Sequence, residues 1–173
     1  LYNQAGEAAG LVAAVPFLRD RDIRRSVPGE SSRERVEMIR QGIIGFYREV
    51  ADVIQRKYSG IRPLIAMGHL FMHKASTSDS EREVQIGNLG SVQAGELPEI
   101  FDYWALGHIH RPQRVAGSSR MRYSGSPIPL SFSEYKDAKQ ALLLDVEEGK
   151  LSQPQQLHVP VFCKLVRISG NYQ

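Results

Sequence analysis

FDYWALGHIH, residues 101–110, is a run of mostly apolar side chains that ends in Gly-His-Ile-His. Apolar and aromatic side chains in a short run are typical of a buried β-strand. The earlier segment PLIAMGH, residues 63–69, ends in the same way, with a glycine followed by a histidine. We therefore expect strands over 63–67 and 101–106, each followed directly by Gly-His.

A single long helix is expected before the two strands. Ser31 and Glu34 have the spacing of a capping box, which predicts a helix that begins there and ends near Lys57. Apolar residues recur at intervals of three and four from Val36 to Ile54, and this stripe is expected to pack on a sheet. Further strands are expected at 1–3, 10–17, 84–86, 113–116, 120–123, 141–146 and 162–168, with loops at 18–29 and 74–83. The first half is thus α/β and the second half mostly β.

The composition is that of an ordinary folded domain. The chain has 173 residues, of which 42% are hydrophobic and 24% charged, and this excludes a disordered or fibrous chain. The single cysteine, Cys163, excludes an internal disulfide and fits a reducing compartment, so we expect a cytoplasmic protein. The apolar run at 10–18 is too short to span a bilayer, which predicts no membrane partner. Because the first residue is Leu1 and not Met, we expect a piece of a longer protein.

The charge of the chain is only weakly positive. The formal net charge is +3, which tolerates a polyanionic partner without requiring one. Arginines gather between Arg19 and Arg25 and could hold phosphates, but Asp20 and Asp22 alternate with them. A solvated loop is the better interpretation of this segment.

The histidines at the strand ends are the main candidates for chemistry. Ligands of α/β sheets gather beyond the carboxyl ends of strands, where His69, His108 and His110 are expected. If the backbone stays extended, His108 and His110 lie on one face and their imidazoles can reach one metal ion or a pair of ions. The alternative, hydrogen-bonded structural histidines, stays open on spacing alone. We expect structural roles for His73 and His158.

Longer motifs point to a known family. FDYWALGHIHRPQ at 101–113 is followed by RYSGSPIPLSFSE at 122–134, and GHLF at 68–71 and PFLR at 16–19 precede them. In this order and spacing they closely resemble the bacterial SbcD exonuclease subunits, which are Mre-type nucleases of the calcineurin-like metallophosphoesterase superfamily. The resemblance implies an α/β fold, with residues 1–160 as the C-terminal part of a two-sheet sandwich flanked by helices. Residues 161–173 would begin a capping, DNA-binding domain.

The same resemblance implies an activity and a set of ligands. It implies a nuclease with two divalent metal ions, usually Mn²⁺, that cuts double-stranded DNA as an exonuclease and single-stranded DNA as an endonuclease during recombination and break repair. His69 and His108 resemble ligands of one ion and His110 a ligand of the other, with the loop 124–127 beside them. The implied partners are DNA, an SbcC-type ATPase subunit and, for the full-length protein, a second copy.

Part of the family's pattern is absent from this sequence. The motifs Asp-x-His, Gly-Asp and Gly-Asn-His-Asp, which supply carboxylates and the catalytic histidine in the family, do not occur. Hard divalent ions prefer oxygen ligands, so we expect this chain alone to bind metal weakly and to be inactive, with no catalytic residue of its own. Two alternatives remain: a calcineurin-like phosphatase or phosphodiesterase for small substrates, and a non-catalytic module that docks a partner through the 31–57 helix.

Overall fold

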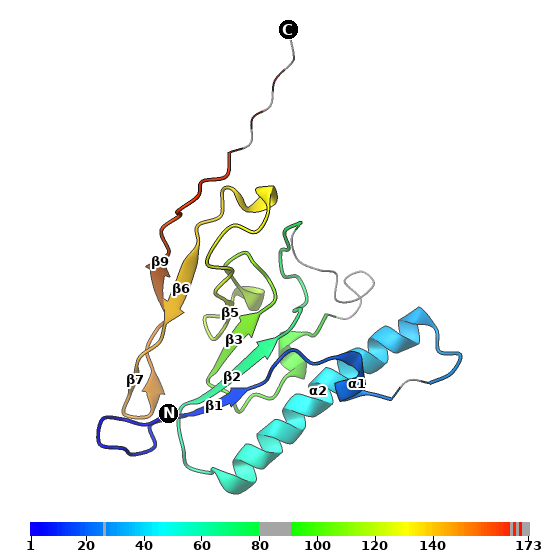
Figure 1. Cartoon of the computed structure of the whole chain (residues 1–173). Helices are drawn as coiled ribbons and strands as arrows, with labels where there is room; N and C mark the ends of the chain where they lie inside the picture. Colours follow the sequence, from blue (N-terminus) through cyan, green and yellow to red (C-terminus); the bar gives the residue numbers. More distant parts are fainter. Residues whose placement is uncertain (26, 80–90, 167, 169, 171–173) are drawn as a thin grey trace.

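The computed structural model describes residues 1–25, 27–79, 91–166, 168 and 170 (Figure 1). The strand expected at 84–86 lies outside these ranges. Over the described residues the chain is a mixed α/β structure with one long helix, and strands dominate its second half, as the sequence predicts.

A five-stranded sheet forms the centre of the molecule, with the strand order β1-β2-β3-β5-β4. The strands of this sheet are β1 Leu11–Ala14, β2 Leu64–His69, β3 Tyr103–Gly107, β4 Gln113–Arg114 and β5 Met121–Tyr123. The first three strands and β5 run parallel, and β4 pairs antiparallel with β5. Parallel strands end at the same edge of a sheet, and the β2–β3 register sets His69 opposite Gly107. The segments that follow both strands therefore meet at that edge.

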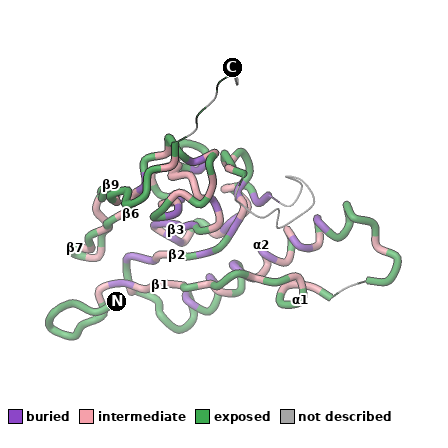
Figure 2. The backbone as a smooth tube through the Cα atoms, turned by 45° about the horizontal axis from the view of Figure 1, so that its top comes forward, coloured by how far each residue is buried: buried purple, intermediate pink, exposed green. Residues whose placement is uncertain are grey.

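The long helix α2, Ser32–Lys57, covers one face of this sheet (Figure 1). Ser31 caps it as predicted: its side chain accepts a hydrogen bond from the Glu34 amide at 3.3 Å, and the Glu34 carboxylate accepts one from the Ser31 amide at 2.8 Å. The predicted stripe packs on the sheet, where the rings of Tyr47 and Trp104 have centroids 5.0 Å apart. Figure 2 shows the buried residues concentrated on β2, β3 and the facing side of α2.

The segment 18–29 differs from the predicted solvated loop. Asp20–Ile23 forms a short helix, α1, and this places Arg24 one turn after Asp20. The Arg24 side chain is only 4% exposed and forms ion pairs with Asp20 and Glu30. The loop interpretation is therefore wrong for Arg24, because alternating acids and bases pair across a helical turn instead of facing water.

The second half holds two small antiparallel pairs of strands. β6, Gln140–Leu143, pairs with β9, Gln155–His158, and β7, Val146–Glu147, pairs with β8, Lys150–Leu151. β9 was not predicted, because all four of its residues are exposed and their sequence shows no alternation of apolar and polar side chains. The strand predicted at 162–168 is wrong over its described residues, where Phe162 is 96% exposed and no neighbouring strand pairs with it.

Three short 3₁₀ helices complete the described elements: Ala94–Glu96, Val115–Gly117 and Phe132–Glu134. The expected strand at 1–3 is reduced to an isolated bridge between Tyr2 and Ala8. Among the described residues, no helix has both the length and the apolar character needed to cross a membrane.

Candidate functional site

His69 and His108 are brought together by the parallel pairing of β2 and β3. His69 is the last residue of β2, and His108 follows β3 directly. Their ring centroids lie 5.0 Å apart, and Nδ1 of His108 is 3.1 Å from Nε2 of His69. The two predicted Gly-His strand ends therefore form one pair of imidazoles at the carboxyl edge of the sheet.

Each histidine of this pair contacts one phenylalanine ring. Phe17 meets the His69 ring edge-on at 5.4 Å between centroids, and Phe71 meets the His108 ring at 6.0 Å. Burial lowers the pKa of His69, and electrostatic interaction with His110 lowers it further. A lowered pKa favours the neutral imidazole, which is the form of histidine that binds metal ions.

A turn of the backbone at His108 separates it from His110. The backbone of His108 has φ of +101°, so the chain turns there and does not continue as an extended strand. The condition under which both imidazoles were expected on one face, an extended backbone, is therefore not met at His108. Nδ1 of His110 lies instead 3.2 Å from a carboxylate oxygen, Oε1 of Glu134.

The loop 124–127 lies against His110, beside the histidines as the resemblance implied. The Ser126 amide donates a hydrogen bond to the His110 carbonyl oxygen at 3.0 Å. Gly125 has φ of +85°, and a Cβ atom at this position would lie 2.7 Å from the same carbonyl oxygen. The positive φ and the close carbonyl oxygen both require a glycine at position 125. The Ser126 N–H is used in a hydrogen bond within the protein.

Sequence reasoning missed two charged residues behind His110. The side chains of Glu134 and Lys139 have no exposed surface, and Oε2 of Glu134 lies 2.5 Å from Nζ of Lys139. The only signal in the sequence was a glutamate that ends the serine-rich stretch SFSE, and such a residue is ordinarily on the surface.

The contacts given for His73 and His158 are with residues other than His69, His108 and His110. Nδ1 of His73 is 3.4 Å from Oγ of Ser91, and His158 ends β9 opposite Gln140. In the part of the chain that the structure describes, no three or more His, Cys, Asp or Glu side chains are grouped so that they could hold a metal ion.

Comparison with curated proteins gives a consistent result. The SbcD subunit of the SbcCD nuclease from Escherichia coli strain K12 is 38% identical over 172 residues, which are 99% of this chain and 43% of that protein. The SbcD subunit of Rhodobacter capsulatus is 34% identical over 173 residues, 97% of this chain and 40% of the relative. The chain is a homologue of the SbcD nuclease subunits. It spans less than half the length of these relatives, and no protein-family model matches it.

The SbcD subunit of Bacillus subtilis gives a shorter match. It is 40% identical over 87 residues, which are 50% of this chain and 22% of that protein. Relatives from three bacterial genera thus share one name, and two of them align with nearly the whole chain.

The spacing of the two imidazole nitrogens can be compared with that of two ligands of a metal ion. Two neighbouring ligands of an octahedral ion, with bonds of about 2.1 Å, lie about 3 Å apart. The 3.1 Å between Nδ1 of His108 and Nε2 of His69 is a hydrogen-bond distance and is also close to this separation. The pair can supply two nitrogen ligands, and oxygen ligands for a hard ion would have to come from other groups.

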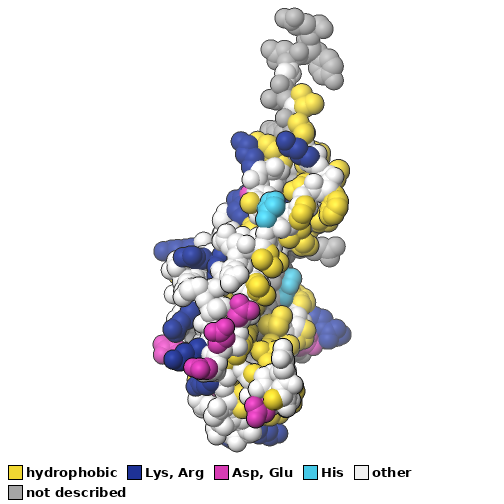
Figure 3. All heavy atoms as spheres, turned by 90° about the vertical axis from the view of Figure 1, so that its left-hand side faces the viewer, with side chains coloured by type: hydrophobic (Ala, Val, Ile, Leu, Met, Phe, Trp, Pro, Cys, Tyr) yellow, Lys and Arg dark blue, Asp and Glu magenta, His cyan; other side chains and the backbone are white. Residues whose placement is uncertain are grey.

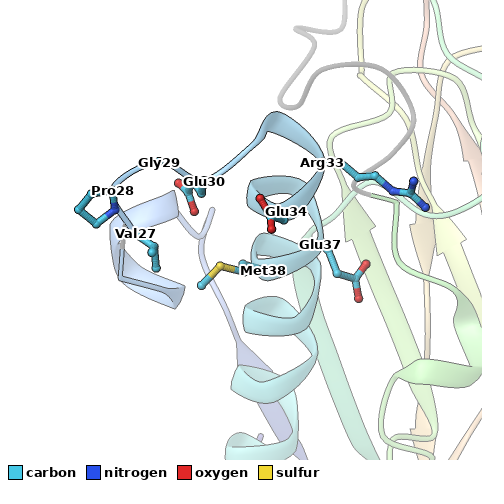
Figure 4. A pocket seen from close by; sticks show the side chains of 8 residues that line it. All are labelled: Val27, Pro28, Gly29, Glu30, Arg33, Glu34, Glu37 and Met38. Atoms are coloured by element: carbon cyan, nitrogen blue, oxygen red, sulfur yellow. The ribbon is translucent and has the colours of Figure 1, made fainter.

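A hollow at the start of α2 offers no comparable chemistry (Figure 4). It measures about 590 Å³ and is lined by Val27, Pro28, Gly29, Glu30, Arg33, Glu34, Glu37 and Met38. Glu34 belongs to the capping box. Hydrogen bonds from Arg40, and to a smaller extent from Gln41, lower the pKa of Glu37 to about 2. These carboxylates already have partners, so this hollow is not a candidate site.

Proposed function

We propose that the chain is part of a metal-dependent DNA nuclease subunit of the SbcD type. One observation carries the proposal: the imidazoles of His69 and His108 converge at the carboxyl edge of a parallel sheet. They do so in a chain that aligns over nearly its whole length with a nuclease subunit. Nitrogen ligands at this edge suit a centre that hydrolyses phosphodiesters.

The chain's own residues would hold and orient the reacting groups. A bound pair of divalent ions, for which we propose Mn²⁺, would polarise phosphoryl oxygens and make hydroxide available near neutral pH. His69 and His108 would hold one ion and His110 the other. Phe17 and Phe71 would help to orient the histidine rings through their edge-on contacts.

The wider setting follows from the same homology. We propose that residues 1–160 form the C-terminal part of a calcineurin-like two-sheet domain and that 161–173 begin a DNA-binding cap. The substrates would be double-stranded DNA for exonucleolytic cleavage and single-stranded DNA for endonucleolytic cleavage. An SbcC-type ATPase and a second copy of the nuclease protein would be the partners, in cytoplasmic recombination and repair.

The chain by itself is proposed to be inactive. Its sequence has no Asp-x-His, Gly-Asp or Gly-Asn-His-Asp motif, and three histidines cannot fill the coordination shells of two hard ions. Robust Mn²⁺-dependent DNA cleavage by the 173-residue chain, abolished by His108→Ala, would contradict this part of the proposal.

A chimaeric protein tests the function itself. In this protein the chain replaces the matching 172-residue segment of the Escherichia coli SbcD protein, and the product is assayed with the SbcC partner. We expect Mn²⁺-dependent cleavage of duplex DNA, loss of cleavage with His108→Ala, and retained cleavage with the matched control His158→Ala. Faster cleavage of a small aryl phosphodiester than of DNA would favour the small-substrate alternative and overturn the proposal.

A further inference from the structure

Glu134 is a buried carboxylate on which several segments of the chain converge. Its Oε1 accepts a hydrogen bond from Oγ of Ser78 at 3.0 Å and lies 3.2 Å from Nδ1 of His110. Its Oε2 accepts hydrogen bonds from Nζ of Lys139 at 2.5 Å and from the Leu130 amide at 3.2 Å. Both oxygens are thus held by donors from separate parts of the chain.

Lys139 is the oppositely charged partner of this carboxylate within the protein. Its ammonium group has three hydrogens and three acceptors: Oε2 of Glu134, Oγ of Ser126 at 2.9 Å and the His110 carbonyl oxygen at 3.4 Å. The Lys139 side chain has no exposed surface, so its charge is balanced by a partner within the protein. Glu134 is that partner, and the pair is neutral as a whole.

The contact with Glu134 bears on which nitrogen of His110 carries the proton. A carboxylate paired with a lysine only accepts hydrogen bonds, so the contact at 3.2 Å points to a hydrogen on Nδ1 of His110. A neutral imidazole has one N–H group, and its lone pair is then on Nε2. The His110 carbonyl oxygen is held as well, by the Ser126 amide at 3.0 Å. Main chain and ring of His110 are therefore both fixed.

We propose that Glu134 is a positioning residue that fixes the ring orientation and the tautomer of His110, so that Nε2 is the nitrogen offered to a metal ion. A carboxylate that receives the N–H of a histidine commonly orients metal-binding histidines in this way. The role toward a metal rests on the proposed function, whereas the position of the proton does not. Lys139 and Ser78 support the role by holding the carboxylate in place.

The protonation of His110 is measurable without metal or DNA. Two-bond ¹H–¹⁵N spectra of the histidine-labelled chain, recorded above the ordinary histidine pKa of about 6.5, distinguish the two tautomers. We expect His110 to be protonated on Nδ1. The double variant Glu134→Gln/Lys139→Met removes both charges together, and we expect it to shift His110 toward protonation on Nε2. The matched control Glu147→Gln changes an exposed acid in β7 and should leave the His110 signals unchanged.

The tautomer measurements test the role of Glu134, and the Mn²⁺ titration tests the proposed function. Protonation of His110 on Nε2 in the unaltered chain would overturn the inference, whether or not the double variant folds. An unchanged tautomer in a folded double variant, with the fold checked by amide hydrogen exchange, would also overturn it. Ser78→Ala keeps the charges in balance and should preserve the Nδ1 proton; loss of that proton would contradict the dominant role of Glu134. A separate titration with Mn²⁺ that leaves every histidine signal unchanged would count against the proposed function alone.

Discussion

Nδ1 of His108 lies 3.1 Å from Nε2 of His69, although 39 residues separate them in the chain. The parallel register of β2 and β3 creates this contact, because it ends both strands at the same edge. On the face drawn in Figure 3, separate histidine side chains lie beside hydrophobic ones. Packing around Tyr47, Tyr123 and the buried Glu134 holds this edge of the sheet together.

Tyr123 anchors the segment that follows His69. Its hydroxyl accepts a hydrogen bond from the Met72 amide at 3.0 Å and donates one to the Leu70 carbonyl at 2.7 Å, and all three residues are buried. Tyr123→Phe leaves both main-chain groups unpaired, so we expect it to lower the free energy of unfolding by about 1–3 kcal/mol in urea denaturation. The control Tyr135→Phe, at a more exposed tyrosine, should change it by less than about 0.5 kcal/mol.

Stability should fall in alkaline solution. Burial raises the pKa of Tyr47 and Tyr123 above the ordinary tyrosine value of about 10. The unfolded chain therefore loses these protons at a lower pH than the folded chain, and stability is lost as the pH rises above about 10. Urea denaturation at a series of pH values measures the loss. Absorbance titration of the folded chain would contradict this explanation if all seven tyrosines ionised together near their ordinary value.

Gly68 is expected to tolerate no side chain. A Cβ atom there would lie 2.0 Å from Oη of Tyr47, whose hydroxyl donates a hydrogen bond to the Met67 carbonyl oxygen. Gly68→Ala should therefore cost about 1–3 kcal/mol of unfolding free energy through overpacking. The control is Gly45→Ala in α2, where a Cβ atom meets nothing within 4 Å. It should stabilise the chain, by about 0.5–1 kcal/mol, because alanine favours helix. Equal effects of the two substitutions would refute the packing argument.

The buried pair of Glu134 and Lys139 should behave as a unit. Lys139→Met leaves a buried carboxylate without its counter-charge, and we expect a loss of about 3–5 kcal/mol in thermal or urea unfolding. Glu134→Gln combined with Lys139→Met should cost less than Lys139→Met alone, because no uncompensated charge remains. Additive losses from the two substitutions would show that the charges are not coupled.

Structural features that depend on residues close together in the sequence were predicted correctly. The capping box at Ser31 and Glu34 places the start of α2 correctly, because capping depends on residues three apart. The Gly-His endings at His69 and His108 locate the edge of the sheet, because an apolar run and a glycine limit where a strand can stop.

Features that depend on distant contacts were not predicted. The backbone of His108 has a positive φ, so the chain turns between His108 and His110, and nothing in the letters GHIH specifies that turn. Glu134 and Lys139 are buried only because Ser78, Ser126 and His110 supply partners from other segments. Arg24 is buried for a similar reason, since Glu30 and Asp20 both reach its guanidinium group.

The central claim, that the histidines at this edge bind a divalent metal ion, is tested most directly by a Mn²⁺ titration followed through the histidine ring signals. We predict that the signals of His69 and His108 broaden first and together, that His158 responds least, and that His69→Ala greatly weakens the response at His108. Broadening of His158 equal to that of His108, or a response at His108 that His69→Ala leaves unchanged, would contradict the claim.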